Sequence, residues 1–174
     1  MLHRLKRFII RIKNLIRWFP IIYRDQDWDT SYIWEIWKFK LKNQAEYIGR
    51  KGHHVDNERD AQRMMTCVRL IERIQEGYYE HEPHTYIETK WNWDDYNESS
   101  DEFFELKSET ISEHFVDYFK KYPRTYKRVR EGGKCGFDIS GKEGMAYAIG
   151  HANHNRAVRL LFKILENYIQ EWWD

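Results

Sequence analysis

The sequence predicts a mainly α protein, a single-domain helical bundle with a long irregular insertion between its third and fourth helices. Apolar residues recur at spacings of three and four over several long segments, which is the period of an amphipathic helix. Capping residues, glycines and prolines separate these segments. Of the 174 residues, 41% are hydrophobic, so the chain fits one domain with a core of its own.

The first predicted element is a basic amphipathic helix in residues 1–20, ahead of a bundle domain in residues 21–174. Pro20 ends this helix. Its apolar stripe consists of Leu2, Leu5, Ile9, Ile12, Ile16 and Phe19. Three roles are open for such a stripe: it packs on its own domain or on a twin subunit, it lies on an anionic membrane surface, or it serves as a nucleic-acid arm.

The second helix is expected to run to about Ile48, where Gly49 and Gly52 stop it, and the third to begin at Asp56 or Asn57. The candidate caps of the second helix are Asp27, Asp29, Thr30 and Ser31. The third helix turns one apolar face inward, made of Met64, Cys67, Val68, Ile71 and Ile74.

Residues 77–100 interrupt the helical period, and the segment TYIETKWNW within them fits a short strand or a hairpin arm. A further helix, intact or broken in two, is expected over about 101–122, with Pro123 interrupting it. The glycine-rich loop GGKCGFDISGKEG precedes the last and longest helix, at about 143–172. These elements complete the predicted bundle.

Charge is distributed unevenly along the chain. Residues 1–24 contain seven Lys and Arg and no acidic residue, whereas the remainder carries 22 basic and 28 acidic side chains, a net charge of −6. A nucleic-acid binder needs a broad basic footprint, so this class is disfavoured. We expect neither a cleaved signal peptide nor a membrane span. Cys67 and Cys135 form no disulfide or zinc pattern, which favours a reducing cytoplasm.

Polar residues suited to ligand binding gather where three helices begin. They are Arg24, Asp27, Asp29, His54, Arg59, Asp60, His151, His154 and Arg156. If these regions meet, Arg and His would hold an anion, and the carboxylates would orient Arg or accept from a base or ribose. Trp28, Tyr32, Trp34 or Trp37 would stack a base. The alternative is purely structural, with Arg59 or Arg63 paired to Asp25, Asp27 or Asp29 so that helix ends are tied together.

A metal site is a second possibility for the same residues. His151 and His154, three residues apart, share one face of the last helix with Val158, Leu161 and Leu165. With His53, His54, Glu58 and Asp60 they would supply the donors that Zn, Mn or Fe accept. No known metal signature matches, so the sequence identifies neither a metal nor a cofactor. Hydrogen-bonded, half-buried histidines are the ordinary alternative.

Three segments resemble a family of small helical proteins encoded by tailed bacteriophages. They are YRDQDWDTSYIWEIWKFKL, GHHVDNERDAQRM with the apolar helix after it, and the terminal LLFKILENYIQEWWD. The resemblance covers about half of the chain and implies a phage origin and the cytoplasm of an infected bacterial host. It transfers no catalytic residue.

These observations favour a non-enzymatic phage accessory protein, acting in counter-defence. It would sequester a nucleotide-like ligand or block a bacterial host protein, and we expect it to form a homo-oligomer through its first helix or its aromatic surface. Two alternatives remain open: a metal-dependent phosphohydrolase that uses His and Asp/Glu at the bundle end, and a structural virion or membrane-peripheral component. Nucleic acid and membrane are the less favoured partners.

Overall fold

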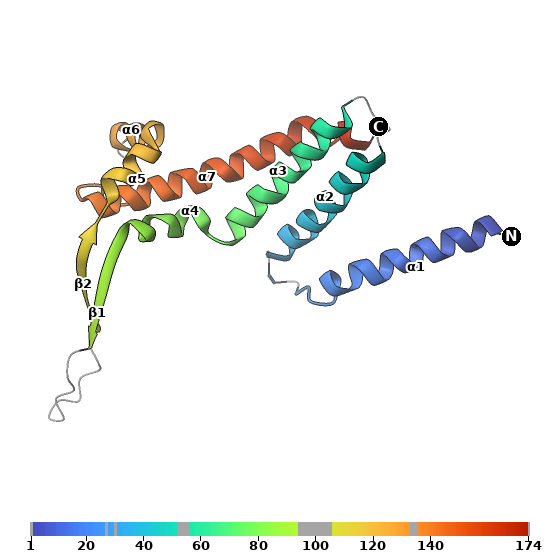
Figure 1. Ribbon diagram of the computed structural model, residues 1–174, viewed down its shortest axis with the longest axis horizontal. Helices are drawn as coiled ribbons and strands as arrows, with labels where there is room; N and C mark the ends of the chain where they lie inside the picture. Colours follow the sequence, from blue (N-terminus) through green and yellow to red (C-terminus); the bar gives the residue numbers. More distant parts are fainter. Residues whose placement is uncertain are drawn as a thin grey trace. The chain divides into compact units, whose positions relative to one another are not determined.

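Helices dominate the computed structural model, which describes residues 2–26, 28–29, 31–51, 56–93, 106–132 and 136–173 (Figure 1). The prediction of a mainly α protein is confirmed. In chain order the elements are α1 (Leu2–Ile22), α2 (Ser31–Lys51), α3 (Asn57–Gln75), α4 (Tyr78–His81), the 3₁₀ turn η1 (Glu82–Tyr86), β1 (Ile87–Trp93), β2 (Leu106–Glu113), α5 (Phe115–Lys121), α6 (Pro123–Gly132), α7 (Lys142–Tyr168) and the 3₁₀ turn η2 (Glu171–Trp173).

The chain packs as two compact units. The first unit consists of Met1–Gln75 and Leu161–Asp174, and the second consists of Glu76–Leu160. Helix α7 contributes its C-terminal part to the first unit and its longer N-terminal part to the second. The boundary between the units thus falls inside the segment 21–174, for which the sequence predicted one bundle domain. The end predicted for the first helix at Pro20 is wrong, because α1 continues through Pro20 to Ile22.

In the first unit, α2 and α3 form an antiparallel pair. Lys38 donates to the side-chain oxygen of Gln75 at 3.0 Å, and the Gln75 amide donates to Glu35 at 3.0 Å. These bonds join the start of α2 to the end of α3. Of the predicted inward face of α3, Ile74 is half-buried and the other four residues are buried, as are Leu41, Ala45 and Ile48 of α2. Burial raises the pKa of the Cys67 thiol to about 11, so this side chain acts as a small hydrophobe.

Helix α2 continues through Gly49, where the sequence predicted that it would begin to end, and its last residue is Lys51, directly before Gly52. A Cβ at Gly49 would lie at an ordinary contact distance of 3.7 Å from the Cβ of Ala61 in α3. The helix therefore packs on α3 through this position. Packing of this kind outweighs the cost of a glycine in a helix, about 1 kcal/mol.

The C-terminal segment covers the α2–α3 pair. The ring of Phe162 lies 6.2 Å from that of Trp34 and 6.0 Å from that of Trp37, both in edge-on contact. The Arg63 guanidinium lies 3.7 Å from the centre of the Tyr168 ring. These contacts engage Trp34 and Trp37, two of the rings predicted to stack a base, in packing between helices.

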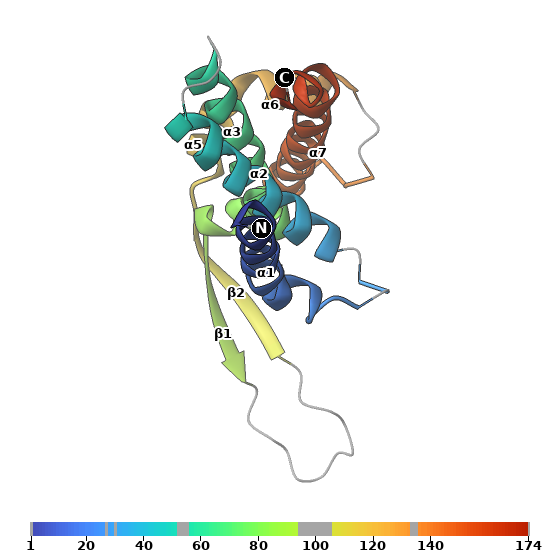
Figure 2. The same ribbon diagram turned by 90° about the vertical axis from the view of Figure 1, so that its right-hand side faces the viewer.

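In the second unit, β1 and β2 pair antiparallel as a hairpin, side by side in Figure 2. The strand predicted within TYIETKWNW is confirmed at Ile87–Trp93. The helix predicted over 101–122 is wrong at Leu106–Glu113, which forms β2. This segment contains the β-branched residues Thr110 and Ile111, and β1 supplies its backbone with hydrogen-bond partners.

Helices α5, α6 and α7 enclose the core of the second unit. The predicted break at Pro123 is confirmed, because Pro123 is the first residue of α6. The buried core consists of Phe115, Tyr118, Val129, Met145, Ala146, Ala148 and Ile149. Large rings on α5 thus pack with small side chains on α7, which lets the helices approach closely.

Gly150 of α7 lies in close contact with neighbouring backbone. A Cβ at this position would lie 2.5 Å from the carbonyl oxygen of Tyr79 and 3.2 Å from Cγ of Pro83. The backbone of α4 and the turn η1 therefore occupy the space that a side chain would need.

We predict that Gly150→Ala destabilises the protein by about 1–3 kcal/mol, because the new methyl group meets backbone that must shift. Gly49→Ala is the matched control. Its methyl group reaches only ordinary contact distance, so the gain in helix propensity stabilises the protein by up to about 1 kcal/mol. Urea unfolding followed by circular dichroism measures both changes. Two changes of the same sign would contradict the close approach at Gly150.

Candidate anion-binding site

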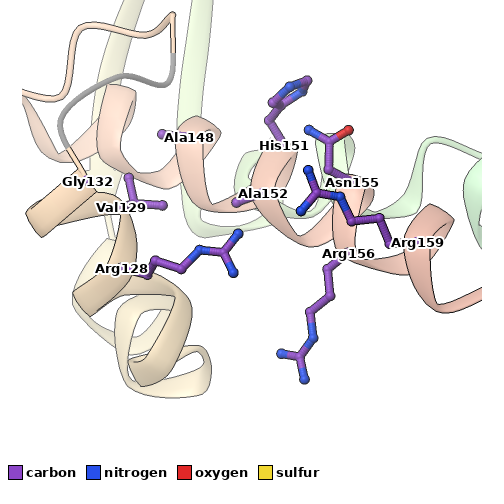
Figure 3. A pocket seen from close by; sticks show the side chains of 9 residues that line it. All are labelled: Arg128, Val129, Gly132, Ala148, His151, Ala152, Asn155, Arg156 and Arg159. Atoms are coloured by element: carbon purple, nitrogen blue, oxygen red, sulfur yellow. The ribbon is translucent and has the colours of Figure 1, made fainter. Parts of the chain in front are cut away.

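A hollow of about 470 Å³ lies between α6 and α7 in the second unit (Figure 3). Helix α6 lines it with Arg128, Val129 and Gly132, and helix α7 lines it with Ala148, His151, Ala152, Asn155, Arg156 and Arg159. No other described hollow combines this volume with three arginines. We therefore take this cleft, called the arginine cleft below, as the candidate site.

Local packing explains why the cleft forms. Val129 is buried against α7, and the hydroxyl of Thr125 donates to Oδ1 of the buried Asn153 at 3.0 Å, which fixes α6 to α7. Ala148 and Ala152 occupy successive turns of α7 on the side that faces α6. Their small side chains leave the space between the helices unfilled.

The lining is strongly basic. Arg128 reaches from α6 toward α7, and Arg159 runs back along α7 toward it (Figure 3). Within the residues that the structure describes, Arg128, Arg156 and Arg159 form no ion pair, and the lining contains no acidic side chain. Three guanidinium groups without counter-charges repel one another, and a bound anion would relieve that repulsion.

His151 lies at the edge of the cleft. Its Nδ1 is 3.7 Å from a carboxylate oxygen of Glu80, and its ring centre is 5.7 Å from that of Phe137. Asn155, one turn further along α7, has a side-chain amide that can both donate and accept hydrogen bonds. The cleft thus offers guanidinium donors, one amide and one imidazole ring, which suits a ligand with an anionic group and a flat polar group.

Two of the predicted site residues, His151 and Arg156, line this cleft. His154 is half-buried, and its Nδ1 has no hydrogen-bond partner among the described residues. Sequence reasoning missed Arg128, Asn155 and Arg159. Their signal was weak but present: the pair of alanines one turn apart on α7 is followed by Asn155, Arg156 and Arg159 on the same side.

The face of α7 also differs from the prediction. His151 was expected on the core-facing stripe with Leu161 and Leu165, but its side chain is 47% exposed, whereas both leucines are buried. The buried side of α7 includes Ala146, Ile149, Asn153 and Ala157. A polar imidazole retains its hydration by facing solvent, while alanines accept the close helix contacts.

At the start of α2, Arg24 and Asp29 line a smaller hollow of about 270 Å³ with Tyr32 and Glu35. The Asp29 carboxylate accepts the backbone N–H of Ser31 at 2.8 Å, so it caps the helix, as the sequence allowed. Asp27 lies outside the described residues, as does His54.

At the start of α3, Arg59 pairs with Asp56 at 2.7 Å, and Arg63 pairs with the buried Asp60 at 2.9 Å. The partners predicted for these arginines, among Asp25, Asp27 and Asp29, are therefore wrong for the described residues. The acids that pair with them are near neighbours in sequence, at the start of the same helix.

The starts of α2 and α3 do not meet. The two helices are antiparallel, and α2 has 21 residues, so its start lies a helix length of about 30 Å from the end that neighbours the start of α3. The structure therefore does not bring Arg24 and Asp29 together with Arg59 and Asp60. His151, His154 and Arg156 belong to the second unit.

The described residues contain no group of three or more His, Cys, Asp or Glu side chains placed to hold a metal ion. His53, predicted as a possible ligand together with His54, also lies outside them. The donors of the arginine cleft are guanidinium and amide groups, which bind anions rather than cations.

A buried carboxylate supports the helices behind the cleft. Glu82 of η1 accepts hydrogen bonds from Lys121, from the Tyr122 hydroxyl at 2.7 Å and from the Tyr78 hydroxyl at 3.3 Å. Burial and the bond to Glu82 raise the pKa of Tyr122 well above its ordinary range. The hydrogen bond that Lys121 donates to Glu82 raises the pKa of Lys121. This cluster fixes η1 to the end of α5, immediately before α6 begins.

Comparison of the chain with protein-family models, with curated proteins and with solved structures finds no match.

We predict that Tyr122→Phe destabilises the protein by about 1.5–3 kcal/mol at pH 8, because the bond to a buried carboxylate is lost. An unfolded tyrosine ionises near pH 10, whereas the folded protein keeps the Tyr122 hydroxyl protonated above that pH. The stability that Tyr122 contributes is thus complete below about pH 10 and declines as the pH rises further.

The difference in free energy of unfolding between wild type and Tyr122→Phe should therefore be smaller at pH 10.5 than at pH 8. Urea unfolding at both pH values measures it. Tyr79→Phe is the control, because the Tyr79 hydroxyl makes no hydrogen bond within the described residues. A Tyr79→Phe variant as unstable as Tyr122→Phe would contradict the role assigned to Glu82.

Proposed function

We propose that the protein binds a nucleotide-like, phosphate-bearing ligand in the arginine cleft. The observation that carries this proposal is that Arg128, Arg156 and Arg159 line one hollow without an acidic residue in its lining. Guanidinium groups bind phosphate through paired N–H donors, and a group of three neutralises a multiply charged ligand. The volume of about 470 Å³ lies within the range of small-molecule pockets, about 300–1,000 Å³.

The composition of the lining supports binding rather than catalysis. Its nine lining residues include no Asp, Glu, Ser or Cys that would serve as a nucleophile or as a carboxylate base. His151 is the one titratable group among them besides the arginines. This composition supports sequestration of the ligand, so the metal-dependent phosphohydrolase is the less supported alternative.

The resemblance of three segments to small tailed-phage proteins supports the biological setting of the proposal. In that setting the protein is a phage accessory factor in the cytoplasm of an infected bacterium, where removal of a nucleotide-like signal would counter a defence response. Blocking of a host protein is the other mode of action that this setting allows.

We predict that Arg128→Ala and Arg159→Ala each weaken binding of nucleoside 5′-monophosphates at least about tenfold, since each removes a charge-assisted bond to phosphate. Arg130→Ala is the matched control: Arg130 is exposed on the same helix, carries the same charge and does not line the cleft. Isothermal titration calorimetry with a panel of nucleoside monophosphates and inorganic phosphate measures the change.

Two results would contradict the proposal. The first is wild-type protein that binds no member of the panel, either in titration or as a ligand retained in native mass spectrometry. The second is Arg130→Ala weakening binding as much as Arg128→Ala, which would indicate a diffuse charge effect instead of a built site.

A further inference from the structure

Helix α1 carries an apolar stripe that the described part of the protein leaves uncovered. The side chains are exposed to between 39% (Ile12) and 68% (Ile16). The stripe consists of Leu5, Phe8, Ile9, Ile12, Leu15, Ile16 and Phe19. These residues recur at three and four along 21 helical residues, so they form one continuous face.

The opposite face of α1 is the one that packs on α2. Arg17 donates to the side-chain oxygen of Asn43, and its guanidinium lies 5.7 Å from the centre of the Phe39 ring. The Trp18 ring meets Phe39 edge-on at 4.7 Å. The helix therefore turns its mixed polar face inward. The sequence left open that the stripe packs on its own domain. The exposed stripe of α1 does not fit that role.

Basic residues border the stripe on both sides. Arg4 and Arg11 follow one edge, Lys6 and Lys13 follow the other, and no acidic residue occurs in positions 1–24. In a pair of helices joined by such stripes, stability requires opposite charges at the flanking positions. Two copies of α1 would instead bring like charges together along their contact. A surface of negative charge is the complementary partner.

We propose that α1 binds the surface of a membrane that contains anionic lipid. The helix would lie in the plane of the interface, with its stripe at the boundary between headgroups and acyl chains and its Lys and Arg among the phosphates. A helix of 21 residues is about 31 Å long and presents this whole length to the surface. Among the described residues, no helix is long and apolar enough to cross a bilayer.

The test uses the full-length protein and vesicles of phosphatidylcholine with or without 30% phosphatidylserine, in a cosedimentation assay at low and high salt. Wild type should sediment with the anionic vesicles and release in high salt. Ile12→Asp combined with Ile16→Asp should lower the apparent affinity at least about tenfold. Lys6→Gln combined with Lys13→Gln should lower it about fivefold for each charge removed.

The control for the aspartate pair is Val116→Asp combined with Leu160→Asp. It replaces two exposed apolar residues outside α1, adds the same charge and should leave sedimentation unchanged. Circular dichroism confirms that each variant is folded, and every residue replaced in these variants is solvent-exposed.

Three results would overturn the proposal. One is wild-type protein that does not sediment with anionic vesicles, and a second is equal binding to pure phosphatidylcholine at any salt concentration. The third is a wild-type dimer, seen by sedimentation velocity, that the aspartate pair dissociates without any vesicle binding. That outcome would assign the stripe to a second copy of the chain. None of these readouts involves the arginine cleft, so the two proposals stand or fall separately.

Discussion

The second unit depends on the missing side chain at Gly150. Because a Cβ there would meet the carbonyl oxygen of Tyr79 at 2.5 Å, only glycine lets α4 and η1 pack so closely on α7. This close contact places Glu82 in the interior, where an unpaired carboxylate would be costly. Lys121 and Tyr122 satisfy it and so fix the end of α5. One steric requirement thereby sets the position from which α6 starts.

The arginine cleft is a consequence of this arrangement. Once α6 is placed, Val129 and the bond from Thr125 to Asn153 fix it to α7, and the alanines of α7 leave a hollow beside the contact. The arginines stand at its sides in water, where mutual repulsion costs little until they are brought together on a ligand. The rigid support comes from buried residues and the binding groups from exposed ones, as small-molecule sites require.

The sequence predicted the features that depend on hydrophobic periodicity, but it did not predict those that depend on tertiary contacts. The 3.6-residue period correctly predicted α2, α3 and α7 and the buried face of α3. It failed at Leu106–Glu113, where pairing with β1 overrides a weak local preference. It also misplaced the face of α7, because alanine and glycine add little to an apolar stripe yet carry the closest contacts. Arg128 was missed for a related reason. A single exposed arginine belongs to no periodic apolar pattern, and the other arginines that line the cleft lie on another helix.

Charge segregation links the two proposals and limits each of them. All charged side chains in residues 1–24 are basic, whereas the rest of the chain has a net charge of −6. An anionic surface therefore attracts α1 and repels the remainder, so that attachment falls to one helix. In the arginine cleft the positive field is local, because screening confines it to about 8 Å at physiological ionic strength. A small phosphate ligand inside the cleft experiences the three arginines, whereas a long nucleic acid would also extend over other parts of a chain whose residues outside 1–24 carry a net charge of −6. The same charge pattern that selects a membrane for α1 thus selects small anions for the cleft.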